Sequence, residues 1–261
     1  MSYGRIAVMS ISTTLSAVSL PTALMGVSTV AFLILERVRP GRELPHSQGW
    51  YLRAVLINLA QFGVTLATAR LWIKIFGAHS LLHLSHLGSP LAQGLVAWFI
   101  GTLVFYWWHR LRHENGWWLA FHQIHHSPSR IEIMTSFYKH PIEILCDAAL
   151  SGLVLYPLLG CSLLGGFWYN FFAGTGEYFY HANVKTPSWL RYLIQTPELH
   201  SIHHQLDVHK FNYSDLPIWD RLFGTYKDAT AFVDRCGFPQ GAETRLVDML
   251  AFKDVYAGNA G

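Results

Sequence analysis

Long stretches of this sequence carry no charged side chain. The first runs from Ile6 to Leu35, and its thirty residues exceed the roughly 20 that an α-helix needs to cross a bilayer. The pattern predicts a second span over about Tyr51–Phe76 and a third over Leu91–Trp108. The 29 residues between Asp147 and Glu177 are also free of charge, but proline and glycine interrupt them. This last stretch therefore predicts either a helical hairpin that dips into the membrane or two short spans.

The overall composition supports the same interpretation. Half of the residues are hydrophobic and only 13% are charged, whereas a soluble domain has roughly 25% charged residues. A secretory signal peptide is the alternative for the first run, but the run is too long and ends in the charged segment 36–39, which resembles a stop-transfer flank. We expect an all-α fold, namely a multi-span integral-membrane helical bundle. It has three spans, the membrane hairpin and a cytoplasmic helical cap that begins near Lys185.

The positions of arginine and lysine predict the orientation of the bundle. The loop between the first two spans contains Arg37, Arg39, Arg42 and Arg53, whereas residues 77–90 contain no Lys or Arg. Because cytoplasmic loops are enriched in these residues, the N-terminus is expected outside and the later polar segments inside. We divide the chain into N-terminal spans (1–90), a central domain (91–230) and a C-terminal tail (231–261).

Histidines follow the third span in a repeated pattern. His109 and His113 are four residues apart, so on a helix both imidazoles project from one face. His122, His125 and His126 have the spacing H-x-x-H-H, again expected on one face, and His200, His203 and His204 repeat it. His181 lies at the end of the predicted hairpin.

These nine histidines predict a site for two metal ions. Imidazole suits Fe, Zn, Cu and Ni, whereas Ca and Mg prefer oxygen ligands. Nine nitrogen donors are too many for one ion. A structural zinc site would normally include thiolates, but the three cysteines, Cys146, Cys161 and Cys236, are far apart and away from the histidines. The formal charge of +3 does not indicate a nucleic-acid partner.

The three histidine boxes inside an apolar chain resemble those of the fatty acid hydroxylase/sterol desaturase superfamily of integral-membrane di-iron oxygenases. The resemblance covers about Leu91–Tyr226 and includes a closing segment, Ile218–Thr225. It implies two Fe ions, with Zn able to replace them in purified samples, held by nine ligands: His109, His113, His122, His125, His126, His181, His200, His203 and His204. It also implies hydroxylation of a C–H bond in a lipid-like substrate (acyl lipid, sterol or isoprenoid) with dioxygen and external electrons.

The electrons are expected to come from a separate protein. The chain contains no haem motif, no G-x-G-x-x-G and no C-x-x-C cluster. The resemblance implies a ferredoxin, or a b-type cytochrome with its reductase, as the donor.

Other polar residues are weaker candidates. Glu114 and Glu177 are the acids that we consider for a catalytic role, and Glu177 occupies a position where some relatives have a further ligand. Glu114 is expected either to orient an imidazole or to pair with a neighbouring arginine. His140 is expected to be a helix-start residue or a donor behind a ligand, with direct metal ligation left open, and His209 is expected to be a surface residue. His79, His83 and His86 are expected at the opposite membrane face.

Three alternatives remain open at this point. A desaturase would use the same centre. A membrane zinc hydrolase would need a carboxylate base, for which Glu114, Glu177 or Glu198 are candidates. A metal transporter would carry its ligands near the middle of the spans, whereas these boxes follow the spans.

Overall fold

The computed structural model describes residues 11–76, 79–114, 116–239 and 241–256. Within these residues the structure is helical, and the only β-type pairing is an isolated bridge between Gln205 and Cys236. The prediction of an all-α fold is confirmed.

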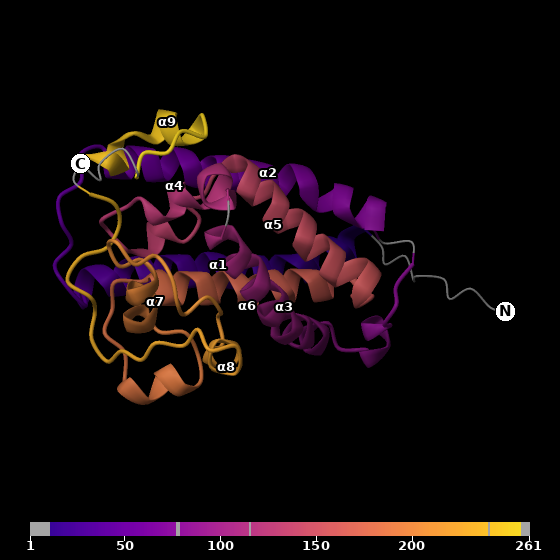
Figure 1. Cartoon of the computed structure of the whole chain (residues 1–261). Helices are drawn as coiled ribbons and strands as arrows, with labels where there is room; N and C mark the ends of the chain where they lie inside the picture. The colour runs from indigo at the N-terminus through magenta and orange to yellow at the C-terminus, as the bar shows by residue number, and fades with distance from the viewer. Residues whose placement is uncertain (1–10, 77–78, 115, 240, 257–261) are drawn as a thin grey trace.

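Five long helical segments lie along one another and form the body of the molecule (Figure 1). They are α1 (Ile11–Val38), α2 (Trp50–Phe76), α3 (Pro90–His113), α5 (Pro141–Leu153) continued by η4 (Val154–Leu158), and α6 (Leu163–His181). Helix α6 packs against both α1 and α3, and α5 packs against α2.

Short helical segments gather at one end of this body and form a cap. They are η2 (Trp118–His122), α4 (Gln123–His126), η3 (Ile133–Thr135), η5 (Ser188–Tyr192), α7 (Pro197–His203), α8 (Pro217–Leu222), η6 (Ala242–Thr244) and α9 (Leu246–Leu250). The short η1 (Leu84–Leu87) lies at the opposite end, where its chain pairs with residues 157–160.

Proline fixes the starts of several helices. α3, α5 and α7 each begin at a proline, which suits the first helical position because its missing N–H would have no partner there. The side chain before the proline caps each helix; His140, for example, accepts a hydrogen bond from the Ile142 amide. One of the two expected roles of His140, the helix start, is therefore confirmed. Because α5 begins at Pro141, Glu143 and Asp147 lie within its first two turns and not in a preceding loop.

Close packing of α3 on α6 depends on glycine. A Cβ added at Gly94 would lie 2.3 Å from the Cβ of Trp168, and one at Gly165 would lie 2.6 Å from Oε1 of Gln93. Small residues at such contacts let two helices approach closely, as is common in membrane bundles.

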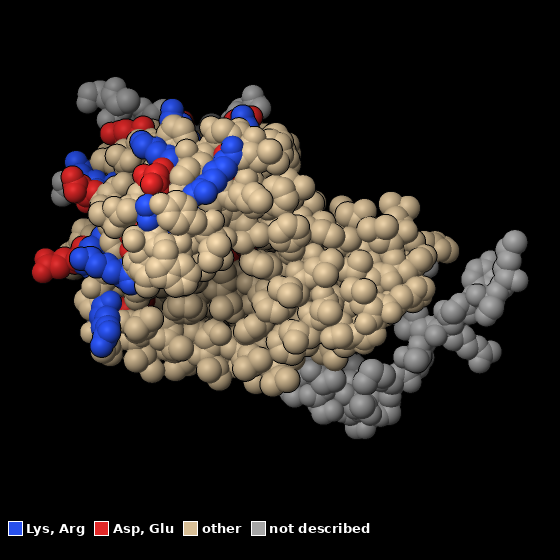
Figure 2. Space-filling view, turned by 90° about the horizontal axis from the view of Figure 1, so that it is seen from below, with Lys and Arg blue, Asp and Glu red and all other residues tan. Residues whose placement is uncertain are grey.

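Three described helices are long and apolar enough to cross a membrane: Leu20–Val38, Pro90–His113 and Pro141–Leu158. The third predicted span is confirmed by this measure, and so is the later part of the first, whose residues 6–10 lie outside the described residues. Helix α2 covers the second predicted span, and this measure does not apply to it because the side chains of residues 66, 69, 70 and 73 are not described. The α5–η4 segment is the third of these helices. On the face shown in Figure 2, charged side chains gather at the cap and leave the rest of the body uncharged. The chain thus has the features of an integral-membrane protein.

The C-terminal segment packs onto the bundle. Phe238, Met249 and Val255 are buried in one hydrophobic cluster with Trp50 and Ala54 of α2. This cluster also contains Ile124 of α4, so the segment closes one side of the cap around the second histidine box.

Candidate metal centre

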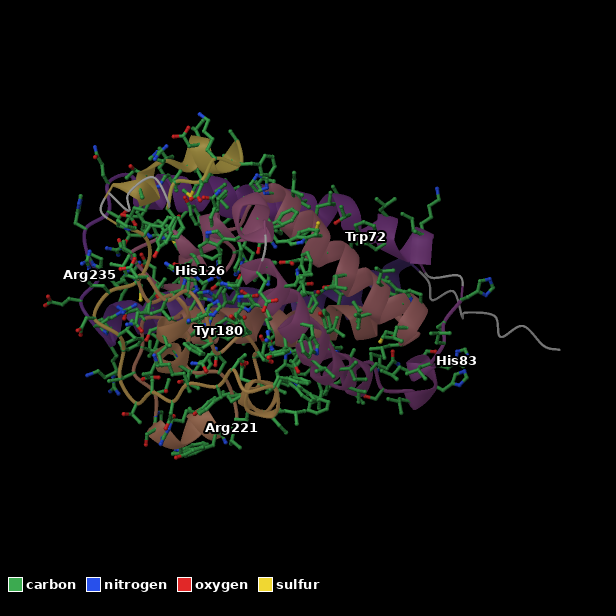
Figure 3. The ribbon with its side chains drawn as sticks, viewed as in Figure 1. Trp72, His83, His126, Tyr180, Arg221 and Arg235 are labelled. Carbon is green, nitrogen blue, oxygen red and sulfur yellow. The ribbon has the colours of Figure 1, made fainter. Side chains whose placement is uncertain are left out.

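All nine predicted ligands lie at the cap end of the bundle. His109 and His113 are at the end of α3, and His181 is the last residue of α6. The two H-x-x-H-H boxes lie on η2–α4 and on α7 with its following residue. Figure 3 shows His126 within this end and His83 at the opposite end of the bundle. Seven of the nine are buried, and His109 and His113 are half-buried.

The nine side chains form two groups. The group of five contains His109, His113, His122, His126 and His203, and the group of four contains His125, His181, His200 and His204. Within each group, one ligating nitrogen per residue lies within 4.8 Å of all the others. The structure therefore brings together every histidine that the sequence predicted as a ligand.

Each H-x-x-H-H box is divided between the two groups, which the expectation of one shared face did not include. His122 and His126 belong to the group of five, whereas His125 between them belongs to the group of four. The last box reverses this arrangement, because His200 and His204 join the group of four and His203 joins the group of five. The rings of His126 and His204 stack at a centroid distance of 4.1 Å, so the two groups are adjacent.

In the group of five, hydrogen bonds determine which ring nitrogen of His109 and of His122 is free to bind a metal ion. Nδ1 of His109 lies 2.7 Å from the carbonyl oxygen of Tyr213, and Nδ1 of His122 lies 2.8 Å from Oε1 of Glu143. A carbonyl or carboxylate oxygen accepts, so each Nδ1 donates and each Nε2 carries a lone pair. These two Nε2 atoms are 3.0 Å apart. Two lone pairs at this distance repel unless a cation lies between them. Two nitrogens at this separation could both lie about 2.1 Å from one ion.

The group of four shows the same convergence. Nδ1 of His181 donates to the Glu177 carbonyl at 2.8 Å, which leaves a lone pair on Nε2. That Nε2 lies 3.0 Å from Nε2 of His200 and 3.3 Å from Nε2 of His125, and Nε2 of His204 is 3.1 Å from that of His200. The residues present therefore fit two cations, one in each group.

Unsatisfied nitrogens support the fit. Buried polar atoms in proteins are nearly always hydrogen-bonded. Within the described residues, the buried Nε2 atoms of His113, His126 and His203 have no hydrogen-bond partner. All three belong to the group of five. Binding of a metal ion would give each of these buried nitrogens the partner that it otherwise lacks.

A short loop, residues 211–213, orients two ligands of the group of five; we refer to it as the carbonyl loop. The carbonyl oxygens of Phe211 and Tyr213 accept hydrogen bonds from Nδ1 of His203 and Nδ1 of His109. His209, Phe211 and Asn212 have positive φ angles of 43°, 70° and 48°. Non-glycine residues rarely adopt this conformation, and where they do they cluster at functional sites.

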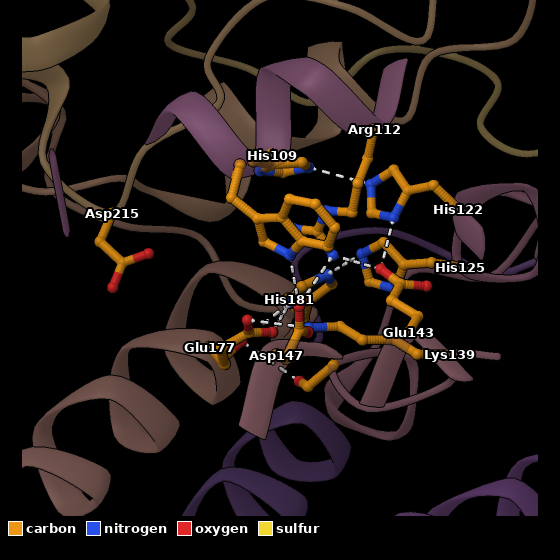
Figure 4. A network of polar contacts seen from close by, with 12 residues as sticks. His109, Arg112, His122, His125, Lys139, Glu143, Asp147, Glu177, His181 and Asp215 are labelled. Carbon is orange, nitrogen blue, oxygen red and sulfur yellow. Dashed lines mark hydrogen bonds and ion pairs between the residues drawn. The ribbon is translucent and has the colours of Figure 1, made fainter. Parts of the chain in front are cut away.

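A network of buried charges lies behind both groups (Figure 4). Oε1 of Glu143 accepts from Arg112 and from His122, and Arg112 also lies 3.7 Å from Asp147. Lys139 continues the network through Asp147 at 3.4 Å and Glu177 at 3.2 Å, and Glu177 precedes His181 by one helical turn. We call Arg112, Lys139, Glu143, Asp147 and Glu177 the buried charge network. It connects a ligand of the group of five to a ligand of the group of four.

Burial keeps the cap histidines neutral. Burial lowers the pKa of His203 to about 3, and it lowers the pKa of His122, His125, His126, His200 and His204 well below the ordinary value. A neutral imidazole is the form that binds a metal ion. The groups are therefore ready to act as ligands at physiological pH.

The other candidates lie outside the two groups. Glu114 is exposed and forms an ion pair with Arg110 at 3.2 Å, which confirms the expected pairing with a neighbouring arginine. Glu177 is part of the buried charge network, and His83 and His86 lie exposed at the far end of the bundle. The expectation of a surface position for His209 is wrong. This side chain is buried under Trp118 and Phe238, and its Nδ1 lies 3.2 Å from Nδ1 of His126.

Sequence reasoning missed several residues at this site. Arg112 and Glu143 are buried and bonded to each other. Asp215 lies apart from these two residues (Figure 4) and bonds to Trp98, and burial raises its pKa to about 7. Arg112 lies between two predicted ligands in the sequence, and this position could have indicated that it belongs to the site. The carbonyl loop has no such signal, because its backbone provides the contacts.

Comparison with known proteins adds an independent observation. A family model described as fatty acid hydroxylase matches residues 94–225, a range that contains all nine histidines. Ornithine lipid hydroxylase of Rhizobium tropici is 34% identical over 77% of this chain and 65% of its own length. A very-long-chain aldehyde decarbonylase of Oryza sativa subsp. indica is 28% identical, over 65% of this chain and 31% of its own length.

A third relative, sphinganine C4-monooxygenase 1 of Arabidopsis thaliana, is 29% identical over 46% of this chain and 48% of its own length. The chain thus spans less than two thirds of the length of each of these relatives. No solved structure gives a significant match.

Proposed function

Because this chain belongs to the fatty acid hydroxylase family, we propose that it is a membrane-bound lipid hydroxylase whose two histidine groups bind two iron ions. The relatives named above include lipid hydroxylases, which supports a lipid substrate. The observation that carries the proposal is the pair of adjacent groups in which imidazole lone pairs converge at 3.0 to 3.3 Å.

Iron bound in the two groups would supply the dioxygen chemistry that attacks an unactivated C–H bond. The protein's own residues prepare the site for it. The carbonyl loop and Glu143 fix the tautomers of His109 and His122, so that their Nε2 atoms point into the group of five. The backbone carbonyl oxygen of Glu177 fixes the tautomer of His181 in the same way. The side-chain carboxylate of Glu177 is paired with Lys139. We assign Glu177 this positioning role.

We place the cap on the cytoplasmic side and the α5–α6 pair in the bilayer. The arginine-rich loop between α1 and α2 supports this orientation, because its residues lie at the cap end. A lipid would then approach the two groups from the apolar body of the bundle, while the electron donor would approach from the cytosol.

The test is expression of the chain in a host that lacks it, followed by mass spectrometry of the lipids under ¹⁸O₂. Hydroxylation predicts a lipid that gains one ¹⁸O atom. A product that loses two hydrogens without gaining oxygen would identify a desaturase on the same centre. No lipid change, together with ester or amide hydrolysis and zinc in the purified protein, would overturn the proposal.

Metal content provides the second part of this test. We expect two iron ions per chain after anaerobic reconstitution, measured by elemental mass spectrometry. A variant with alanine at both His122 and His200 removes one ligand from each group and should lose both. One ion per chain in the reconstituted wild type would argue against a binuclear centre.

A further inference from the structure

Hydroxylation consumes electrons that this chain does not hold. One C–H bond and one O₂ molecule give one C–OH group and one water, and this conversion takes up two electrons and two protons. A carrier that delivers one electron at a time must therefore dock twice per turnover. This requirement depends on the proposed function, whereas the surface described below can be tested separately.

We propose that Lys210, Phe211 and Lys227 form the docking site for an acidic one-electron carrier protein; we call these three residues the lysine patch. Both lysines are exposed, and the Nζ of each lies 5.3 Å from the centre of the Phe211 ring. Within the described part of the chain, neither lysine forms an ion pair. The patch therefore presents two uncompensated positive charges around a half-buried aromatic ring.

The patch has a direct connection to the metal centre. The carbonyl oxygen of Phe211 accepts a hydrogen bond of 2.8 Å from Nδ1 of His203. Nε2 of His203 faces the group of five. One hydrogen bond and a few covalent bonds thus separate the surface ring from a predicted ligand. A redox protein seated on the patch would bring its cofactor close to this route.

Asn212 keeps the two halves of the patch together. Its side chain accepts from the amide of Lys227 and donates to the carbonyl oxygens of Lys227 and Leu199. The buried amide thus fixes segment 210–213 beside segment 225–227. A pre-formed surface of this kind loses little conformational entropy when a partner binds.

Charged residues of both signs lie beside the patch, and the acidic one, Asp228, is paired with Arg191 at 2.9 Å. Arg221 is exposed nearby on α8, and its guanidinium stacks over the Tyr226 ring at 4.4 Å (labelled in Figure 3). A positive surface of this size favours an acidic partner, because complementary charge accelerates encounter and fixes orientation. The patch belongs to the cap and not to the apolar body that faces lipid, which favours a protein over a lipid headgroup.

The experiment uses the full chain in nanodiscs and a plant-type [2Fe–2S] ferredoxin as the acidic probe. The double variant Lys210→Glu/Lys227→Glu should bind ferredoxin about 10-fold more weakly, and its binding should lose most of its salt dependence. Lys185→Glu is the matched control. Lys185 is also exposed on the cap, but it lies near the first residues of α7. Lys210 follows the last residue of α7, so the control changes a cap lysine outside the lysine patch. This control should bind ferredoxin as the wild type does.

Two further measurements separate the possible failures. With dithionite and methyl viologen in place of ferredoxin, the double variant should hydroxylate lipid at the wild-type rate and contain as much iron. Equal ferredoxin binding by the wild type and the double variant would overturn the docking proposal and leave the proposed function intact. Loss of binding to anionic vesicles alone, with unchanged ferredoxin binding, would also overturn it in favour of a lipid site. A wild type that does not hydroxylate lipid with either reductant would instead refute the proposed function.

Discussion

The two histidine groups differ in how their outer nitrogens are held. In the group of five, Nδ1 of four ligands has a hydrogen-bond partner: carbonyl oxygens of the carbonyl loop hold His109 and His203, Glu143 holds His122, and His209 holds His126. In the group of four, His181 is held by the Glu177 carbonyl and His200 lies 3.4 Å from the Gln195 amide. Within the described residues, Nδ1 of His125 and Nδ1 of His204 have no partner.

This difference leads us to expect that the two groups bind their metal ions with different rigidity and strength. Partners behind a ligand fix its ring and raise its basicity, so we expect the group of five to be the more rigid group and to bind a metal ion more strongly. The group of four has one ligand fewer and two rings without an outer partner, so it can change its coordination more easily. The following four predictions test this contrast, from the largest expected effect to the smallest.

Removal of a ligand should give the largest effect. His122→Ala should remove the ion from the group of five and His125→Ala the ion from the group of four, each leaving about one iron per chain. Hydroxylation should fall below about 1% of wild type in both, because losing a ligand exceeds the 10–100-fold loss typical of outer partners. Iron analysis and turnover measure both effects. Loss of both ions in both variants would show that the groups do not load separately.

Glu143→Gln should weaken only the group of five. The amide keeps an acceptor near Nδ1 of His122 but loses the charge that Arg112 and His122 share, so ion affinity there should fall about 10-fold or more. Alanine is less suitable, because it leaves the buried Arg112 guanidinium without this partner. Chelator competition reports the affinity of each ion. Equal weakening of both ions would mean that the charge network supports the groups jointly.

Chelation of the wild type should release the ions in two phases. The group of four should release its ion first, about 10-fold faster than the group of five, because two of its rings have no outer partner. The time course of iron release into excess chelator measures this. The slow phase alone should accelerate in Glu143→Gln, and a single phase in the wild type would remove the contrast.

Glu114→Gln should have the smallest effect. Its exposed ion pair with Arg110 contributes at most about 1 kcal/mol. Turnover should therefore stay within about twofold of wild type, and the free energy of unfolding should change by no more than about 1 kcal/mol. His83→Ala, at the far end of the bundle, serves as a second surface control. A large loss of turnover in Glu114→Gln would restore this acid as a catalytic candidate.

The sequence was most informative where local spacing determines the outcome. His109 and His113 lie one turn apart at the end of an apolar run, so both their helix and their shared direction followed from the pattern. The long helices followed instead from the length of the uncharged stretches. In contrast, the assignment of His125 and His203 to the opposite group from their neighbours depends on how α4 and α7 meet, which spacing alone does not determine.

The remaining errors have a common physical cause. The residues next to His209 in the sequence have the composition of a surface loop. His209 is nevertheless buried, because Phe238 and Tyr256 of the C-terminal segment pack against its ring. Glu143 looks like a solvated acid at a helix start, yet Arg112 from α3 reaches it within the bundle. Both results depend on contacts between segments far apart in the chain. The carbonyl loop is invisible for a different reason, because any residue can supply a carbonyl oxygen.

The division of each histidine box between the two groups also constrains how such a protein can evolve. Because α4 and α7 each contribute histidines to both groups, a change in the length of one box would affect both groups. Inserting a single residue between His122 and His126 would rotate part of the box by about 100° and spoil both sites at once. Natural variation that tunes one ion alone must therefore act from outside the boxes, through residues such as Glu143, His209 and Gln195.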